Sequence, residues 1–296
     1  MKSVLLIFID GLGIGANDPV INPCLDSKIE LFSFPYHNKD VIPVSGKGYC
    51  YPTDATLGIE GLPQSATGTA TLLTGVNCAQ ELKRHVPGFP NNQLTEIIRK
   101  ESILKKVNQK GLSSTFINAY RPLFFKLKES TQWRLSTTTV ANLAAGNSFY
   151  SLEDIQKHIS IYHDYTNKSL IDRGFAVPVF SAREAAKILA AVSEKFNLVV
   201  YEYFLTDRAG HTQDRERAVQ AMVQIEKLIL SLIDILDFRG KLLMAVSDHG
   251  NIEDLSVKTH TRNNVGTYVW GKESGNYSPE INDISDIAKI ILEFLS

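Results

Sequence analysis

The sequence is poor in cysteine, and its three cysteines are widely spaced. Cys24, Cys50 and Cys78 are an odd number and contain no CxxC pair, which excludes the disulfide framework of many secreted proteins. We therefore expect a reduced, cytoplasmic protein. Long apolar runs are also lacking, because none approaches the roughly 18 residues of a membrane helix. The run from Val4 to Ile9 is short, stops at Asp10 and is followed by no cleavage site, so it indicates a buried strand and not a signal peptide.

An excess of charge of one sign is likewise absent. The chain has 31 Lys and Arg against 32 Asp and Glu, a net charge of -1, which gives no electrostatic basis for binding nucleic acid or an acidic membrane. With 296 residues, 44% of them hydrophobic, the chain can form one large α/β domain or a core with a small insertion. We expect a small-molecule partner, and no feature of the sequence indicates an oligomeric state.

Short β-branched, apolar runs alternate with segments of helical period. The expected strands are 4–9, 114–117, 198–205, 241–246 and 267–270, and the expected helices are 67–73, 95–110, 182–194, 214–237 and 284–295. Continuous apolar runs of this length indicate strands that are covered on both faces. The alternation therefore predicts an α/β fold with a doubly wound, mostly parallel central sheet flanked by helices.

One segment, residues 121–181, breaks this alternation. It contains a Ser/Thr cluster, many aromatic residues and one expected helix near 152–165. We interpret it as a small cap inserted into a core that consists of residues 1–120 and 182–296.

Three carboxylates and three histidines adjoin the ends of the expected strands. They are Asp10, Asp207, His211, Asp248, His249 and His260. Ligands of doubly wound sheets bind outside the carboxyl ends of the strands, so we expect these side chains to converge on one rim. Six nitrogen and oxygen donors suit a pair of divalent metal ions with positions left for substrate. A single Asp or His is more often a cap or a core residue, but the complete set favours two metals, Zn or Mn in preference to Mg.

The stretch GLPQSATGTATLLTG, residues 61–75, contains a candidate nucleophile. Ser65 takes the position of an N-cap before a helical run that ends at Leu73, and a helix start is the simplest interpretation. A serine there also faces backbone N–H groups and the positive end of the helix dipole, which favour a phosphate. A metal near the hydroxyl would make Ser65 a nucleophile at neutral pH.

The ordered motifs IDGLG, LPQSATG, TDRAGH, SDHGN and THT resemble those of the alkaline phosphatase superfamily of metalloenzymes. They are most similar to its branch of cofactor-independent phosphoglycerate mutase and phosphopentomutase, over about residues 1–120 and 190–271. The resemblance implies an alkaline phosphatase-like fold. It also implies that Ser65, three residues before Gly68, is the residue that becomes phosphorylated.

The resemblance further implies how the six donors divide between two metals. One site would consist of Asp10, Asp248 and His249 with Ser65 bridging, and the other of Asp207, His211 and His260. In this arrangement each of the carboxylates and imidazoles at the strand ends would have a metal ion as its partner.

The sequence departs from the mutase pattern in two ways. The mutases have a much larger cap with basic side chains that hold the substrate, whereas 121–181 has about 60 residues and offers four basic candidates in its first 14 positions: Arg121, Lys126, Lys128 and Arg134. Thr69 follows the nucleophile motif where mutases tend to have His. A short cap should leave water a route to the phosphoserine, so we expect hydrolysis in preference to isomerisation.

These observations predict a two-metal phosphohydrolase that acts on a small phosphoester through a phosphoserine intermediate. The alternatives are a phosphomutase acting on a sugar phosphate or phosphoglycerate, a phosphodiesterase or nucleotide pyrophosphatase, and a metal-stabilised binding protein. Sulfatase activity is disfavoured, because no Pro or Arg follows Ser65 in the pattern that those enzymes require.

Several further residues are candidate substrate contacts. Arg84 and His85 could bind a substrate anion or cap a helix end, and Arg262 and Asn264 could contact phosphate. Within the expected cap, Phe124, Phe125 and Trp133 could line a pocket for an apolar or ring-bearing leaving group or could form a small core.

Overall fold

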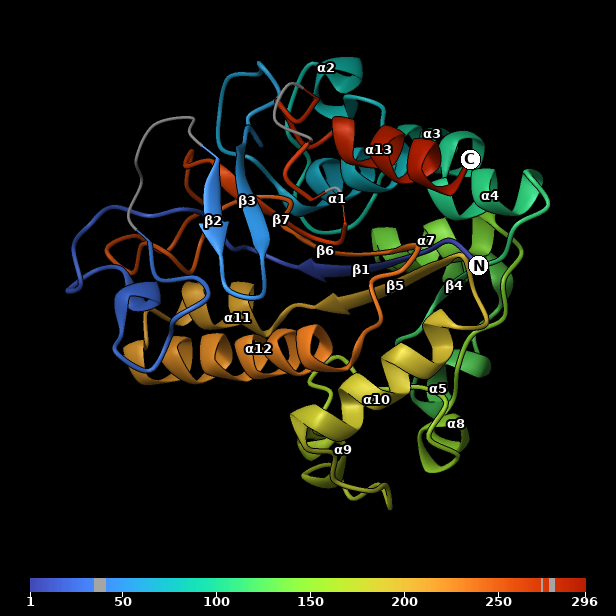
Figure 1. The fold of residues 1–296 in the computed structure, drawn as a ribbon. Coiled ribbons are helices and arrows are strands. Elements are labelled where there is room, and N and C mark those ends of the chain that lie inside the picture. Colours follow the sequence, from blue (N-terminus) through green and yellow to red (C-terminus); the bar gives the residue numbers. More distant parts are fainter. Residues whose placement is uncertain (35–40, 273, 277–279) are drawn as a thin grey trace.

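The computed structural model describes residues 1–34, 41–272, 274–276 and 280–296, and its centre is a seven-stranded sheet with helices on both faces (Figure 1). The strands are β1 (Ser3–Ile9), β2 (Ile42–Val44), β3 (Gly48–Thr53), β4 (Ser114–Phe116), β5 (Leu198–Tyr203), β6 (Lys241–Val246) and β7 (Val265–Trp270). They lie in the order β2-β3-β7-β6-β1-β5-β4.

The sheet is mixed. Strands β4, β5, β1 and β6 run parallel, with Ile7 in register with Tyr201 on one side and Ala245 on the other. Strands β7, β3 and β2 extend the sheet through antiparallel pairings. The α/β fold flanked by helices is confirmed, but antiparallel pairing is as frequent as parallel pairing among the six strand pairs.

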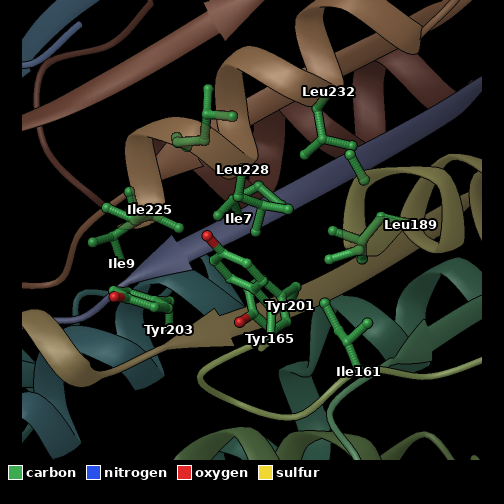
Figure 2. Close-up of a cluster of buried hydrophobic side chains, with 14 of the residues drawn as sticks. Ile7, Ile9, Ile161, Tyr165, Leu189, Tyr201, Tyr203, Ile225, Leu228 and Leu232 are labelled. Carbon is green, nitrogen blue, oxygen red and sulfur yellow. The ribbon is translucent and has the colours of Figure 1, made fainter. Parts of the chain in front are cut away.

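Both faces of the sheet are buried, and alternate residues of one strand serve different cores. In β1, Leu5, Ile7 and Ile9 pack toward one set of helices, whereas Leu6 and Phe8 pack toward the other. Figure 2 shows part of the first core, where Ile7 and Ile9 face residues of helix α12 (Arg215–Ile235). Because each face of the sheet needs apolar side chains, β1 is apolar throughout. This explains why apolar and polar residues do not alternate along its sequence.

The remaining elements are short or medium helices. They are η1 (Pro23–Leu25), α1 (Ser65–Thr74), α2 (Cys78–Leu82), α3 (Asn92–Glu101), α4 (Ile103–Gln109), α5 (Pro122–Phe125), α6 (Glu129–Gln132), α7 (Thr137–Ala144), α8 (Leu152–Gln156), α9 (Lys168–Ile171), α10 (Ala182–Ser193), α11 (Leu205–Thr212) and α13 (Asp286–Leu295). Figure 1 shows α1, α3, α4 and α13 on one side of the sheet and α10 and α12 on the other.

Two helix predictions and one strand prediction need correction. The expected helix 95–110 is divided into α3 and α4, because Ser102 leaves the helical conformation and ends the first helix. The expected strand 198–205 ends at Tyr203, and α11 begins at Leu205. The expected helix 152–165 reaches only Gln156, and the backbone has a positive φ of 57° at His158.

The antiparallel strands β2 and β3 were not expected. Each contains a proline, Pro43 and Pro52, which lacks the N–H group that a central strand needs. β2 forms an edge of the sheet, and it is only three residues long. Short strands that contain proline give almost no hydropathy signal.

The segment 121–181 contains the short helices α5 to α9. Helix α7 packs against α1, α3 and α4, and Val140 belongs to the core on that face. Ile161 and Tyr165 belong to the opposite core. The division of the chain into a core and a cap stays a prediction.

Among the described residues, no helix is both long enough and apolar enough to span a membrane.

Candidate metal centre

The six predicted metal ligands converge at the carboxyl edge of the parallel strands. Asp10 follows β1, Asp248 and His249 follow β6, and α11 after β5 carries Asp207 and His211 in its first and last turns. The segment that leads to β7 adds the sixth residue, His260. The six form two groups of three, Asp10–Asp248–His249 and Asp207–His211–His260, and within each group the potential ligand atoms lie within 4.8 Å of one another.

The first group, which we name the inner set, consists of Asp10, Asp248 and His249. His249 Nε2 lies 3.3 Å from Asp10 Oδ1 and 3.6 Å from Asp248 Oδ2. Asp248 and His249 are fully buried, so this set is closed toward the protein interior.

The second group, the outer set, consists of Asp207, His211 and His260. Asp207 Oδ1 lies 3.4 Å from His211 Nε2 and 3.6 Å from His260 Nε2. His211 is 45% exposed, so this set opens to solvent. The imidazole rings of His249 and His260 stack with centroids 3.7 Å apart, which makes the two sets immediate neighbours.

Each histidine presents the same nitrogen to the centre. The Nδ1 atoms face backbone carbonyl oxygens: that of His211 lies 2.7 Å from Lys258 O, that of His260 lies 2.8 Å from Pro63 O, and that of His249 lies 3.4 Å from Gly250 O. A hydrogen on Nδ1 satisfies these carbonyls and leaves the Nε2 lone pair for a ligand. This arrangement is typical of metal-binding histidines.

The electrostatics of the inner set fit a divalent cation. Burial, followed by the neighbouring carboxylates of Asp248 and Asp207, raises the pKa of Asp10 well above its usual value. Burial also raises the pKa of Asp248, and Asp10 Oδ1 is buried without a hydrogen-bond partner. Clustered carboxylates of this kind need a compensating positive charge, which a divalent ion provides.

The predicted nucleophile lies beside the inner set. Ser65 Oγ is 2.9 Å from His249 Nε2, although the two residues are far apart in the sequence. Ser65 is the first residue of α1, and Gln64 takes the N-cap position, so the expected N-cap assignment is wrong by one residue. The hydroxyl still projects from the N-terminal turn of a ten-residue helix, where the dipole favours an anion.

Side chains around the six donors fix their positions. Thr69 Oγ1 donates to Asp248 Oδ2 at 2.9 Å. Asn251 Nδ2 donates to Asp207 Oδ1 at 2.6 Å. The threonine that stands where mutases tend to have histidine therefore orients a carboxylate of the inner set.

Glu253 organises the loops behind the centre and was missed by sequence reasoning. Its buried carboxylate accepts hydrogen bonds from the backbone N–H groups of Gly13, at 2.9 Å, and Asn251, at 2.7 Å. The side chains of Thr261 and Asn263 also donate to it. A Cβ at Gly13 would overlap the Glu253 carboxylate, so the glycines of GLGIG were a usable signal for a group packed against this loop.

The four residues that we expected to contact substrate do not form one group in the structure. Arg262 Nη1 donates to Gly61 O in the loop that leads to Ser65, and burial together with the Arg262 cation lowers the pKa of His85. Arg84 follows α2 and is exposed, and Asn264 uses its carbonyl to accept from the N–H of Ile14. Their contact with substrate stays a prediction.

Known proteins with similar sequences are metalloenzymes. Residues 174–296 match the model of the Metalloenzyme superfamily. The 2,3-bisphosphoglycerate-independent phosphoglycerate mutase of Desulforudis audaxviator is 27% identical over 124 residues, which cover 40% of this chain and 24% of the mutase. The corresponding mutase of Francisella tularensis subsp. novicida is 33% identical over 129 residues, 40% of this chain and 25% of the mutase. The matched region thus spans about a quarter of the length of these relatives.

Solved structures share the fold over nearly the whole chain. A protein from Pyrococcus horikoshii superposes with a TM-score of 0.60 at 14% identity, covering 99% of this chain and 96% of the other. Alkaline phosphatase from the Antarctic bacterium TAB5 superposes with a TM-score of 0.57 at 12% identity, covering 99% and 98%. The alkaline phosphatase-like fold expected from the motifs is thereby confirmed.

Proposed function

We propose that the chain is a metalloenzyme of the alkaline phosphatase superfamily and that it acts as a two-metal phosphohydrolase on a small phosphoester through a phosphoserine at Ser65. The match of residues 174–296 to the Metalloenzyme superfamily and the partial similarity to the mutases support this family. The observation that carries this proposal is the 2.9 Å distance between Ser65 Oγ and His249 Nε2. This contact places a nucleophile at a helix N-terminus beside two adjacent sets of metal-ligand side chains.

The inner set and the outer set would each hold one divalent ion, and we propose Zn or Mn from their Asp and His composition. When bound, the two ions supply positive charge that stabilises the charge developing on a transferring phosphoryl group. The thiols of the chain are buried and unpaired, which supports a cytoplasmic location.

The chain's own residues perform two displacements at phosphorus. Ser65 Oγ attacks the phosphoryl group and gives up its proton, its bond to phosphorus forms, and the bond to the leaving alcohol breaks as that oxygen takes up the proton. The N–H groups at the start of α1 stabilise the anion. A water molecule then attacks the phosphoserine, the Oγ–phosphorus bond breaks, and Ser65 Oγ takes up a proton from the water as phosphate leaves.

Isomerisation is the second candidate, and the similarity to the two mutases favours it. In that case the phosphoserine would return its phosphoryl group to another hydroxyl of a retained molecule. The similarity covers 40% of this chain and about a quarter of each mutase, so it does not extend over the whole of either protein. The short length of the segment 121–181 supports hydrolysis, because a short cover leaves water a route to the phosphoserine.

A panel of phosphoesters assayed with Zn, Mn and Mg in turn tests the proposal. We expect release of free phosphate in the presence of metal, and a loss of more than about a thousandfold in Ser65→Ala. The variant should keep its fold, since Ser65 is not the N-cap of α1 and its hydroxyl contacts His249 of the centre, and it should keep most of its metal.

Two results would contradict this function. Near-normal turnover by metal-loaded Ser65→Ala would exclude the phosphoserine. An isomerised product with little free phosphate would establish the mutase alternative. The matched control is Ser130→Ala, since Ser130 is an exposed serine in α6 outside the centre.

A further inference from the structure

A cavity adjoins the metal centre at the carboxyl ends of β4 and β5. Its volume is about 300 Å³. Its lining includes Phe116, Tyr120, Phe124, His163, Glu202 and Phe204. Glu202 lies near the end of β5, and the N–H of Asp10 bonds to the carbonyl of the next residue, Tyr203, at 3.0 Å. The Glu202 carboxylate is among the groups that raise the pKa of Asp10, so the cavity borders the inner set.

The walls of this cavity are aromatic. The rings of Tyr120 and Phe124 lie with centroids 4.1 Å apart, and the ring of His163 stacks on Phe204 at 4.2 Å. Aromatic walls favour flat aromatic ligands through offset stacking and edge contacts. A volume of about 300 Å³ is at the lower end for small-molecule sites, which suits one or two fused rings.

Two polar groups in the cavity are poorly satisfied by the protein. Within the part of the chain that the structure describes, the Glu202 carboxyl accepts one hydrogen bond, from Thr138 Oγ1 at 2.8 Å. His163 Nδ1 is buried without a partner, and burial lowers the pKa of His163 to about 3, so the ring is neutral. Both groups can accept a hydrogen bond, and a buried acceptor without a donor is energetically unfavourable.

Asn118 holds the Glu202 backbone in place. Its Nδ2 donates to Glu202 O at 2.7 Å, and its Oδ1 accepts from Glu202 N at 2.9 Å. At the cavity, Arg121 contributes a cation, and Arg208 and Arg173 are close enough to lower the pKa of His163. The surroundings therefore combine fixed acceptors inside with positive charge nearby, which suits a neutral ring joined to a phosphate.

From this combination we propose that the cavity binds the organic part of the substrate and selects phosphoesters whose alcohol carries a flat aromatic ring with an N–H or O–H donor. This inference rests on the proposed function of the neighbouring metal centre. Glu202 and His163 accept from the ring's donors, and the rings of Tyr120 and Phe124 cover its faces. A sugar or glycerate group would leave these walls without matching contacts.

Two pairs of substrates test the selectivity and distinguish the possible sources of such a ring. Adenosine 5′-monophosphate against ribose 5-phosphate isolates a nucleobase, and 1-naphthyl phosphate against glycerol phosphate isolates a simple aryl group. We expect adenosine 5′-monophosphate to have a kcat/KM higher than that of ribose 5-phosphate by about tenfold or more. 1-Naphthyl phosphate, whose ring carries no hydrogen-bond donor, should show a smaller preference over glycerol phosphate. Phe124→Leu should remove most of that preference, and Glu202→Gln should weaken it mainly for the nucleotide.

Trp133→Leu is the matched control. Trp133 belongs to the same 121–181 segment but lines a different cavity, where Arg99 lies over its ring at 4.3 Å. This variant should keep the preference. Equal kcat/KM within both pairs, or an equal loss in Phe124→Leu and Trp133→Leu, would overturn the inference.

Binding measurements separate a failure of this inference from a failure of the proposed function. Ser65→Ala protein loaded with metal is titrated with adenosine and with 1-naphthol, with and without the Phe124→Leu substitution. Binding that depends on Phe124 supports the cavity assignment even if no phosphoester is turned over. If neither alcohol binds and neither aromatic ester is preferred, the cavity assignment is wrong while hydrolysis can still hold.

Discussion

Glu202 is a carboxyl group in β5 that the protein holds in a poorly solvated position. Burial raises its pKa from 4.5 to about 7, and the hydrogen bond from Thr138 opposes this shift. Between these two pH values the folded protein retains a proton that the unfolded chain has released. The contribution of Glu202 to stability is therefore complete below pH 4.5 and is lost as the pH rises to about 7.

Glu202→Gln removes this titration. In metal-free protein, the free energy of unfolding of the variant relative to the wild type should increase by roughly 1–3 kcal/mol between pH 4.5 and 7.5. Urea denaturation across this pH range in the presence of a chelator measures the difference. Glu216→Gln removes an exposed carboxyl in α12 as the control, and an equal pH slope for the two variants would contradict the prediction.

At the scale of elements, helix α1 and the end of β6 are in close contact at Gly68. A Cβ at this position would lie 2.6 Å from the backbone oxygen of Asp248. Replacing glycine by alanine inside a helix normally stabilises it by about 0.5–1 kcal/mol. Here the obstacle is backbone and not a flexible side chain, so the helix must shift and carry Ser65 with it.

Gly68→Ala should therefore lower kcat by about 10- to 100-fold while the protein stays folded, because displacements below 1 Å already disturb the alignment of reacting atoms. Steady-state kinetics and circular dichroism measure the two effects. Leu72→Val, also in α1, removes one buried methylene without a clash near Asp248. Similar kcat losses in both variants would indicate general loosening of the helix and not a displaced nucleophile.

The elements that could be predicted from the sequence are those whose signal is local. β1, β5 and β6 are buried on both faces, so each is a largely apolar run, and the carboxyl ends of such parallel strands must meet. This is why six donors scattered along the chain could be assigned to one rim. The strand β3 could not be found, because Pro52 and few apolar residues conceal a strand that its neighbours hold in place.

No local sequence pattern predicts the cavity beside the metal centre. Its walls come from the end of β4 and residues 118–127, from the end of β5 and from the segment around His163, and aromatic residues in a sequence do not distinguish a cavity wall from a core. Of the three aromatics expected to line a pocket, Phe124 lines this cavity and Trp133 lines another. Phe125 is 47% exposed.

At the scale of the whole molecule, the two donor sets tie together segments that are distant in the sequence. The inner set joins the end of β1 to the end of β6, and the outer set joins α11 to the segment before β7. Metal ions that bind these sets only in the folded protein should stabilise the entire fold. At a free metal concentration of 100 times the dissociation constant, each site should add about 2.7 kcal/mol.

Removing one ligand at a time should separate these contributions. Asp248→Asn should lose the inner metal and His211→Asn the outer one, each reducing the metal content from two to one per chain and the metal-dependent rise in Tm by about half.

Because the inner set is buried and the outer set is open to solvent, a chelator should remove the outer metal first. Binding at both sets should weaken at acid pH, since imidazole must be deprotonated to bind a metal. Elemental analysis and thermal unfolding of the two variants measure these effects, and the exposed surface variant Glu216→Gln should retain both metals. Loss of both metals in both variants would show that the donors form one cooperative centre, and an unchanged Tm on chelation would contradict the proposed metal sites.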